Sequence, residues 1–324
     1  MKAIVYTKYG SPDVLHLREV EKPTPKAGEV LVKVYASSVN SWDWDLLKGK
    51  PLLVRIIGGP LKPRSKILGA DIAGQVEAVG NNVTQFKPGD EVFGDIAESG
   101  FGGFAEYVSV PEKLLAKKSP AMTFHQAAAL PQAGLLALQG LEYKGALKRS
   151  RKVLINGAGG GVGTLALQYA KLSGAEVTCV DKAEKFEMLR SLGADTLIDY
   201  TKEDYTRTGL QYDLILDVIA HRAFSDYKRA LMPGGTFAMI GGSMGGLLFR
   251  LMLSGSLPSK SVSKKLGIMG YKPNRSDLDR LSRLFEEGKI VPVIDRIYPL
   301  NEVADAFRYF GTGEVKGKIV ISIN

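Results

Sequence analysis

The sequence predicts an α/β fold with two parts, a compact barrel-like domain and a domain built on a doubly wound parallel sheet. Three observations carry this prediction. The chain has 324 residues, 45% of them hydrophobic, which is enough for two domains with buried cores. Residues 1 to about 120 contain short strands separated by turns. From Lys152 onward, strands alternate with helices.

The first part of the chain has the pattern of a small barrel. Residues 29–39 (EVLVKVYASSV) and the opening residues 1–10 alternate apolar and polar side chains, as half-buried strands do. Further strands are predicted at residues 70–80, 90–96 and 104–111, each bounded by Gly or Pro. Many short strands bounded by turns favour a closed or nearly closed barrel.

The middle of the chain has the rhythm of βαβ units. A helical pattern covers residues 123–143, and Thr123 is a candidate N-cap. Strands are then predicted at residues 153–156, 176–180, 196–200, 213–218 and 236–242, with 267–271 as a candidate sixth strand. Helices are predicted at residues 161–173, 183–192 and 222–231. This alternation is typical of a doubly wound parallel sheet.

The last part of the chain has the same kinds of element. Helices are predicted at residues 276–287 and 302–310, and strands at 291–300 and 317–324. Periodicity leaves open whether the final elements return to the first domain.

Composition favours a soluble protein in a reducing compartment, either the cytoplasm or the stroma of an organelle, and not a secreted one. The opening residues lack the apolar core of a signal peptide, and the most apolar window, residues 127–141, is too short to span a bilayer. The single cysteine, Cys179, cannot form an internal disulfide. The net charge is +9, but the basic residues are dispersed, so no specific nucleic acid partner is expected.

The motif with the clearest chemistry is the glycine loop in VLINGAGGGVGTLALQYAKLSGAEVTCVD, residues 153–181. It follows a predicted strand and opens a predicted helix, which is the context that a dinucleotide-binding loop requires. Glycines allow a tight turn and a close approach of a pyrophosphate, which the N–H groups of the helix start then bind. The candidate pyrophosphate-binding residues are Gly157, Gly160, Gly161, Val162 and Gly163.

The end of the second strand bears on the choice of cofactor. Asp181 stands where an acid binds the adenosine ribose hydroxyls and repels a 2′-phosphate, which favours NADH. Lys182 and Lys185 follow it, and their charges could neutralise such a phosphate. The residues alone therefore lean toward NADH without deciding between NADH and NADPH.

A catalytic zinc is not expected. The chain has only His16, His125, His221 and Cys179 as soft or imidazole ligands, and their spacing is not that of a metal site. The predicted reaction is therefore one that needs no Lewis acid. Hydride transfer to a quinone or to an α,β-unsaturated carbonyl compound meets this condition, because the acceptor is already electrophilic.

A set of motifs spread over the whole chain resembles the zinc-independent quinone oxidoreductase branch of the medium-chain dehydrogenase/reductase superfamily, close to the group of the chloroplast-envelope quinone oxidoreductase. Besides the glycine loop, the motifs are MKAIVYTKYG, ASSVNSWDWDLLKG, ILGADIAGQVEAVG, FKPGDEVFG, FAEYVSV, ALPQAGLLALQGL, LRSLGAD, MPGGTFAMIGG and GKIVI. The resemblance implies a split GroES-like β-barrel catalytic domain, residues 1–122 and 272–324, with a Rossmann NAD(P)-binding domain, residues 123–271, inserted between its parts.

The same resemblance implies roles for individual residues. Asn40 matches an asparagine near the nicotinamide, and Asp43 matches the acid of the VN-x-x-D pattern, for which helix capping is as good an interpretation as catalysis. Zinc-binding relatives carry cysteine in place of Asn40 and a His-Glu pair in place of Ala70 and Asp71. The remaining cofactor-binding residues implied are Ala133, Leu136, Val218, Ile219, Ile240, Gly241 and Gly242.

Three departures from the family pattern affect the site. Leu136 replaces a threonine next to the nicotinamide. Asp45 stands where several quinone reductases have a tyrosine, so Trp42, Trp44 and Asp45 are predicted to shape the substrate pocket instead. Asp181 stands where NADPH-specific members have a small residue, although Lys185 matches a lysine that some members place at the 2′-phosphate. The family favours NADPH and the acid favours NADH.

The sequence thus predicts a zinc-independent, NAD(P)H-dependent oxidoreductase that acts on quinones or enones. The family also implies a homodimer. The alternative is a nucleotide-binding protein of low turnover that acts as an RNA-binding or structural partner. Peripheral contact with an anionic membrane is a further expectation, without a transmembrane segment.

Overall fold

The computed structural model of the chain describes residues 1–149, 151–241, 265–268 and 270–323. The chain divides into two compact units, which are described separately. The first unit consists of Met1–Leu135 and Lys272–Asn324, and the second of Leu136–Tyr271.

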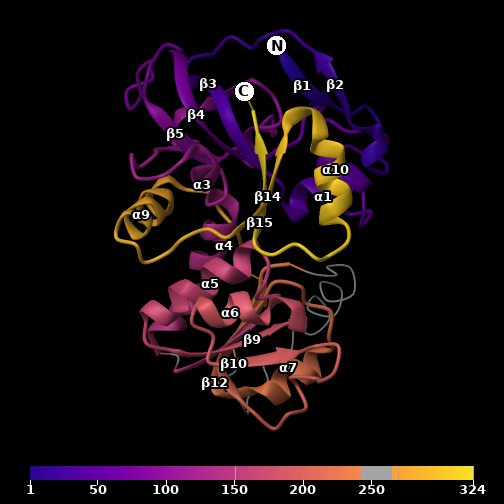
Figure 1. Cartoon of the computed structure of the whole chain (residues 1–324), viewed down its shortest axis with the longest axis vertical. Helices are drawn as coiled ribbons and strands as arrows, with labels where there is room; N and C mark the ends of the chain where they lie inside the picture. Colours follow the sequence, from indigo (N-terminus) through magenta and orange to yellow (C-terminus); the bar gives the residue numbers. More distant parts are fainter. Residues whose placement is uncertain (150, 242–264, 269, 324) are drawn as a thin grey trace. The chain divides into compact units, whose positions relative to one another are not determined.

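The first unit is built on a mainly antiparallel sheet in which neighbouring strands follow the order β14-β15-β3-β4-β5-β7, with β6 also paired to β3 (Figure 1). A separate antiparallel pair, β1 and β2, completes its strands. The strands are β1 (Lys2–Val5), β2 (His16–Glu19), β3 (Glu29–Ser38), β4 (Asp71–Val79), β5 (Glu91–Asp95), β6 (Tyr107–Pro111), β7 (Leu115–Lys117), β14 (Ile294–Pro299) and β15 (Lys318–Ser322). The α-helices are α1 (Ser41–Lys48), α2 (Val54–Gly58), α3 (Phe124–Ala128), α9 (Arg275–Glu286) and α10 (Val303–Phe310).

The register of three strands positions the polar residues of this unit. Ser38 lies opposite Asp71 in the antiparallel pair of β3 and β4. On the other side of β3, β15 runs antiparallel and places Val320 opposite Ser38. The last strand of the chain therefore joins the sheet of the first unit, a point that periodicity left open.

The second unit is a parallel sheet in the order β10-β9-β8-β11-β12-β13. This is the doubly wound order in which the chain starts at the centre, builds one half and then crosses to build the other. The strands are β8 (Lys152–Asn156), β9 (Glu176–Asp181), β10 (Thr196–Asp199), β11 (Tyr212–Asp217), β12 (Leu231–Met239) and β13 (Lys265–Ile268). The α-helices are α4 (Pro131–Leu141), which begins in the first unit, α5 (Gly161–Leu172), α6 (Phe186–Ser191) and α7 (Phe224–Ala230).

The predicted fold class is confirmed, and the differences lie in particular elements. The single helix expected over residues 123–143 is two helices, α3 and α4, because Pro131 has no N–H with which to continue the first one. Strand β2 was not predicted, since all four of its residues are exposed and show no apolar alternation. The candidate sixth strand exists as β13, two residues earlier than expected, and pairs in parallel with β12.

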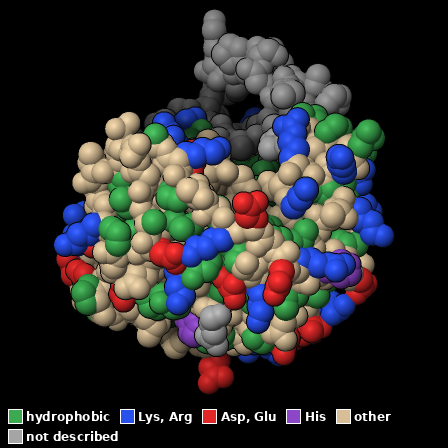
Figure 2. Space-filling model, turned by 90° about the horizontal axis from the view of Figure 1, so that it is seen from above, with side chains coloured by type: hydrophobic (Ala, Val, Ile, Leu, Met, Phe, Trp, Pro, Cys, Tyr) green, Lys and Arg blue, Asp and Glu red, His purple; other side chains and the backbone are tan. Residues whose placement is uncertain are grey.

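Charge is distributed as the sequence suggested. On the face drawn in Figure 2, lysine and arginine side chains are interspersed with aspartate and glutamate and form no single basic field. Within the part of the chain that the structure describes, no helix combines the length and the hydrophobicity needed to cross a membrane.

Candidate active site

The glycine loop lies at the carboxyl end of β8 and has one fixed shape. Gly157 has a φ of +80°, which glycine adopts without strain. Its N–H donates to the carbonyl oxygen of Val180 at 3.0 Å, which ties the loop to the end of β9. A Cβ on Gly163 would lie 2.4 Å from the carbonyl oxygen of Gly157, so the backbone of α5 packs against the backbone of the loop with no room for a side chain.

The open side of the loop is at Gly160 and the first turn of α5. Gly160 is the N-cap of α5, and a Cβ built on it would have no neighbour closer than 3.7 Å. The N–H groups of Gly161, Val162 and Gly163 belong to the first helical turn, where backbone donors have no acceptor within the helix. A phosphate could bind here, because the site has space for it, backbone N–H donors and the positive end of the helix dipole.

Asp181, at the end of β9, is engaged by the protein itself. One of its carboxylate oxygens accepts the N–H of Gly159 at 2.7 Å, and the other accepts the N–H of Lys182 at 2.9 Å. The ammonium of Lys185 lies 3.4 Å from the same carboxylate, and both side chains are buried. The acid predicted to select the cofactor is therefore half of an ion pair that also supports the glycine loop.

Two further loops lie at the same edge of the sheet, because they follow β11, which pairs in parallel with β8, and β12, which pairs in parallel with β11. After β11, the N–H of Val218 donates to the carbonyl of Asn156 at 3.1 Å. After β12, the N–H of Ile240 donates to the carbonyl of Asp217 at 3.0 Å. Ile219 is 45% exposed, and a Cβ on Gly241 would lie 2.5 Å from the carbonyl oxygen of Val218.

Two of the predicted cofactor residues lie on α4, and a third is not among the described residues. Ala133 and Leu136 are both on α4, Ala133 buried and Leu136 partly exposed. Gly242 lies outside the described residues.

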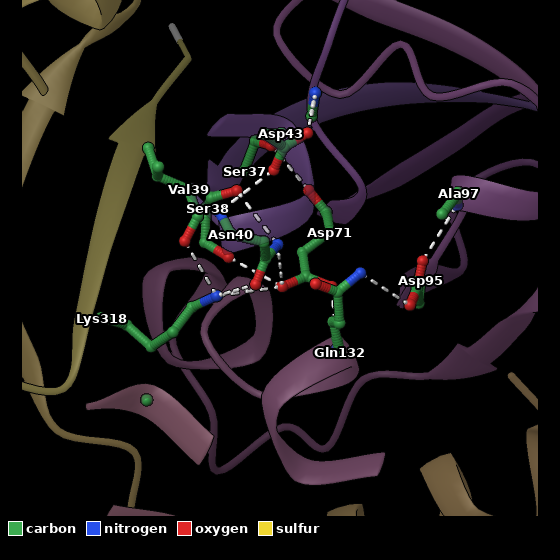
Figure 3. A network of polar contacts seen from close by, with 12 residues as sticks. Ser37, Ser38, Val39, Asn40, Asp43, Asp71, Asp95, Ala97, Gln132 and Lys318 are labelled. Carbon is green, nitrogen blue, oxygen red and sulfur yellow. Dashed lines mark hydrogen bonds and ion pairs between the residues drawn. The ribbon is translucent and has the colours of Figure 1, made fainter. Parts of the chain in front are cut away.

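In the first unit, a buried polar network surrounds the carboxylate of Asp71 (Figure 3). One oxygen accepts the Ser38 hydroxyl at 2.8 Å and the Asn40 side-chain N–H at 3.0 Å. The other oxygen accepts the backbone N–H of Gln132 at 2.9 Å. Asp71 is completely buried, so these donors replace the water that its charge has lost.

Lys318 supplies the positive charge of this network. Its ammonium lies 2.5 Å from Asn40 Oδ1, 3.2 Å from the carbonyl oxygen of Val39 and 3.3 Å from Asp71 Oδ2. Its side chain is 5% exposed. Asn40 is thus held at both ends of its amide, by a cation at the oxygen and by an anion at the nitrogen.

Asp43 is directed into the protein and caps α1. One of its oxygens accepts the N–H of Asn40 at 3.0 Å and the other the N–H of Gly69 at 2.9 Å. Burial raises the pKa of Asp43 to about 7, and the nearby charge of Asp71 raises it as well, while the two N–H donors and Lys318 act in the opposite direction. This geometry supports the capping interpretation of Asp43.

The predicted substrate-pocket residues have different surroundings. Trp44 stacks on Phe307, with ring centroids 6.3 Å apart, and contacts Phe310, so it packs on α10. Trp42 is partly buried against the same core. The carboxylate of Asp45 is partly exposed and has no hydrogen-bond or ion-pair partner among the described residues, and burial raises its pKa to about 6.

Comparison with known proteins identifies the family. Residues 26–120 match the alcohol dehydrogenase GroES-like domain, and residues 192–321 match the zinc-binding dehydrogenase family. The chain is 34% identical to a chloroplast envelope quinone oxidoreductase homolog of Arabidopsis thaliana, over 99% of this chain and 98% of that protein. The chain belongs to the quinone oxidoreductase branch of the medium-chain dehydrogenase/reductase superfamily.

Two further similarities agree with this branch. An NADPH-dependent alkenal/one oxidoreductase of Arabidopsis thaliana, named as chloroplastic, is 34% identical over 99% of this chain and 79% of its own length. The structure of the quinone oxidoreductase from Coxiella burnetii superposes with a TM-score of 0.90 at 29% identity, covering 100% of this chain and 99% of that one. The chain is therefore an oxidoreductase that uses NAD(P)H, and the RNA-binding or structural alternative is not favoured.

Lys318 is the residue of the buried polar network that sequence reasoning missed. The motif GKIVI was noted, but the burial of its lysine was not predicted. The only local signal is weak, since Lys318 is followed by three apolar residues of the same strand (KIVIS). Only the pairing of β15 with β3 brings it to Asn40 and Asp71.

The buried pair of Lys318 and Asp71 yields a stability prediction. Lys318→Met leaves the Asp71 charge buried without its cation, so we expect the free energy of unfolding to fall by about 3 kcal/mol. The double variant Lys318→Met with Asp71→Asn should lose less free energy of unfolding than the two single variants lose in sum, because the two residues interact. Urea denaturation of both single variants and the double variant measures this coupling.

A surface ion pair serves as the control. Lys22 pairs with Glu77, and both side chains are more than one third exposed, so Lys22→Met should lower the free energy of unfolding far less than Lys318→Met does. Strictly additive losses for Lys318→Met and Asp71→Asn would contradict the proposed pairing.

Asp43 yields a pH prediction. Its pKa is about 7 in the folded protein and near 3.8 when unfolded, so the folded protein binds the proton more tightly. Its contribution to stability is present below pH 4 and is lost as the pH rises to about 7, by up to about 1.4 kcal/mol per pH unit. Urea denaturation between pH 4.5 and 7.5 should show wild type losing stability relative to Asp43→Asn. A difference that does not change with pH would refute the raised pKa.

Proposed function

We propose that the chain reduces quinones or α,β-unsaturated carbonyl compounds by hydride transfer from NADPH, without a catalytic metal. The observation that carries the metal-free part is the ammonium of Lys318, which contacts Asn40 and Asp71. These are two of the positions at which the resemblance places the metal ligands of zinc-binding relatives.

The residues at these positions do not fit zinc. Asn40 offers a neutral amide, Ala70 offers no donor atom, and Asp71 already accepts four hydrogen bonds or ion-pair contacts. A second cation beside the Lys318 ammonium would be repelled. Among the described residues, no group of three or more His, Cys, Asp or Glu side chains is placed to hold a metal ion.

The second unit has the residues that would hold the cofactor. We assign the diphosphate to the N–H groups of Gly161, Val162 and Gly163 at the start of α5. The loops that contain Val218–Ile219 and Ile240–Gly241 lie at the same edge of the sheet and would border the rest of the dinucleotide. When bound, NADPH supplies a hydride from C4 of its nicotinamide ring.

Without a Lewis acid, the acceptor must be electrophilic on its own, and a quinone or an enone is. The negative charge that develops on its oxygen needs hydrogen-bond donors rather than a strong base. We assign this role to polar groups near Asn40 and to bound water, because the side-chain N–H groups of Asn40 itself are directed to Asp71 and to the carbonyl of Ser38. In this proposal Asp43 is a positioning residue, because it holds the backbone N–H of Asn40. The proton that completes the reduction comes from solvent.

NADPH is proposed over NADH because of the pair of Asp181 and Lys185. The lysine neutralises the carboxylate, so the acid repels a 2′-phosphate less than a free aspartate would. Lys182 adds a second cation next to the pair, and its side chain is partly exposed. The NADPH dependence in the name of the alkenal/one relative points the same way. The homodimer implied by the family stays a prediction.

The proposed reaction is tested by following the absorbance of NADPH and NADH with a panel of quinones, enals and enones. We expect oxidation of NADPH that depends on the acceptor and is unchanged by a metal chelator. Gly160→Ala is the matched variant, because its Cβ has room in this structure but would occupy the place of the diphosphate.

That variant should raise the KM for NADPH tenfold or more while its melting temperature stays that of the wild type. Activity lost on chelation and restored by zinc would overturn the metal-free proposal. No oxidation of either dinucleotide with any acceptor would overturn the function itself.

Cofactor preference is tested with Lys185→Met and Asp181→Ser. If the lysine masks the acid, Lys185→Met should raise the KM for NADPH about tenfold and leave that for NADH nearly unchanged. Asp181→Ser should lower the KM for NADPH by a comparable factor, because it removes one negative charge and releases the Lys185 ammonium. Unchanged KM values for NADPH in both variants would overturn the assignment of this pair to cofactor choice.

A further inference from the structure

Gln132, the second residue of α4, is fixed at two points by the buried polar network around Asp71 (Figure 3). Its backbone N–H donates to Asp71 Oδ1 at 2.9 Å, and its side-chain Nε2 donates to Asp95 Oδ2 at 3.3 Å. Asp71 also accepts the side-chain N–H of Asn40, so one carboxylate holds both Gln132 and Asn40. Gln132 therefore lies in the part of the first unit to which the proposed function assigns the acceptor oxygen.

The side-chain amide of Gln132 has a fixed orientation. Asp95 lies opposite Asp71 in the antiparallel pair of β4 and β5, and its other oxygen accepts the N–H of Ala97 at 2.9 Å. A carboxylate accepts hydrogen bonds but cannot donate them, so it selects the nitrogen end of a neighbouring amide. The Nε2 group of Gln132 is therefore held toward Asp95, and Oε1 is directed away from it.

Gln132 Oε1 has no hydrogen-bond donor among the described residues. The other side chains of the network are engaged, since Asn40 is bonded at both ends of its amide and the ammonium of Lys318 contacts three oxygens. In the described chain, the only enclosed side-chain polar atoms without a partner are the Tyr212 hydroxyl and Arg222 Nε. Gln132 is 6% exposed, and its oxygen is not one of these two atoms, so that oxygen reaches solvent.

We propose that Gln132 is a positioning residue, whose Oε1 accepts a hydrogen bond from the water molecule that protonates the reduced acceptor. The proposal rests on the proposed function, which takes this proton from solvent. A water that donates one hydrogen to Oε1 keeps its other hydrogen for the acceptor oxygen near Asn40. A donor aimed at the oxygen on which charge develops lowers the barrier to hydride transfer.

The atoms and charges of this step balance for an enone. The hydride forms a C–H bond at the β-carbon, NADPH becomes NADP⁺, and an electron pair of the conjugated system moves onto the carbonyl oxygen. An O–H bond of the held water then breaks, and its proton joins that oxygen. The hydroxide that remains takes a proton from solvent, and the enol rearranges to the saturated ketone.

Two variants test this role with 3-penten-2-one as the acceptor. Gln132→Met keeps the length of the side chain and removes the hydrogen-bond acceptor. In Asp95→Asn, the side-chain oxygen can still accept the Ala97 N–H, so the new amide nitrogen faces Gln132 and turns Oε1 inward. Both variants should lower kcat about tenfold or more and leave the KM for NADPH nearly unchanged, because the glycine loop is intact.

The solvent isotope effect is a readout that a merely structural role would not move. In the wild type, turnover should be slower in D₂O than in H₂O, because the held water supplies the proton. This difference should shrink in both variants. An isotope effect that is the same in all three proteins would overturn the proposal. So would a loss of kcat in Gln132→Met that Asp95→Asn does not share, since Asp95→Asn keeps the buried groups paired.

Gln75→Met is the matched control. Gln75 lies on β4 outside the network, and its Nε2 donates to the carbonyl of Gly89 at 3.2 Å. This variant should keep the kcat and the isotope effect of the wild type. An equal loss of kcat in Gln75→Met would overturn the proposal.

A high-resolution crystal structure separates this proposal from the proposed function. The wild type should show an ordered water within hydrogen-bond distance of Gln132 Oε1, and Asp95→Asn should not. If the wild type oxidises neither dinucleotide, the proposed function fails, and this structure still tests the water. A wild-type structure without that water would overturn the inference even where the enzyme is active.

Discussion

The ion pair of Asp71 and Lys318 is the interaction on which the site of the first unit depends. Both charges are buried, and a buried charge is tolerated only when a partner and hydrogen bonds replace its water. The pair joins β4 to β15, and Asn40 lies between the two charges. A shift of one residue in either strand would separate them, so the pair fixes the register of the sheet and the orientation of Asn40 together.

In the second unit, Asp181 likewise pairs with a lysine and also accepts a backbone hydrogen bond. The carboxylate of Asp181 accepts an N–H of the glycine loop and pairs with Lys185, so a residue of the proposed cofactor site also holds the loop in its shape. A fixed loop loses little conformational freedom when a dinucleotide binds, which favours affinity. In both units a lysine forms an ion pair with an aspartate at the proposed site. In both, the lysine neutralises the negative charge that the aspartate alone would present.

The segment of residues 48–66 differs from these buried pairs. Lys50 and Lys62 are exposed, where water screens their charges. The backbone between them is held by hydrogen bonds from Tyr9 and Arg55. The fold thus uses lysine in two ways, because Lys318 replaces solvent inside the protein whereas Lys50 and Lys62 remain in water.

The sequence by itself determined the fold class, the βαβ rhythm, the glycine loop and the family, because periodicity and glycine spacing are local properties of the chain. It named Asn40 and Asp181 as candidate site residues but did not indicate the buried charges that contact Asn40. Only the tertiary structure brought Lys318 to Asn40, 278 residues away in sequence, and showed that Asp181 and Lys185, four residues apart, are both buried and form an ion pair. The burial and charge of a side chain depend on which distant strands or loops pack around it, and no local pattern records that.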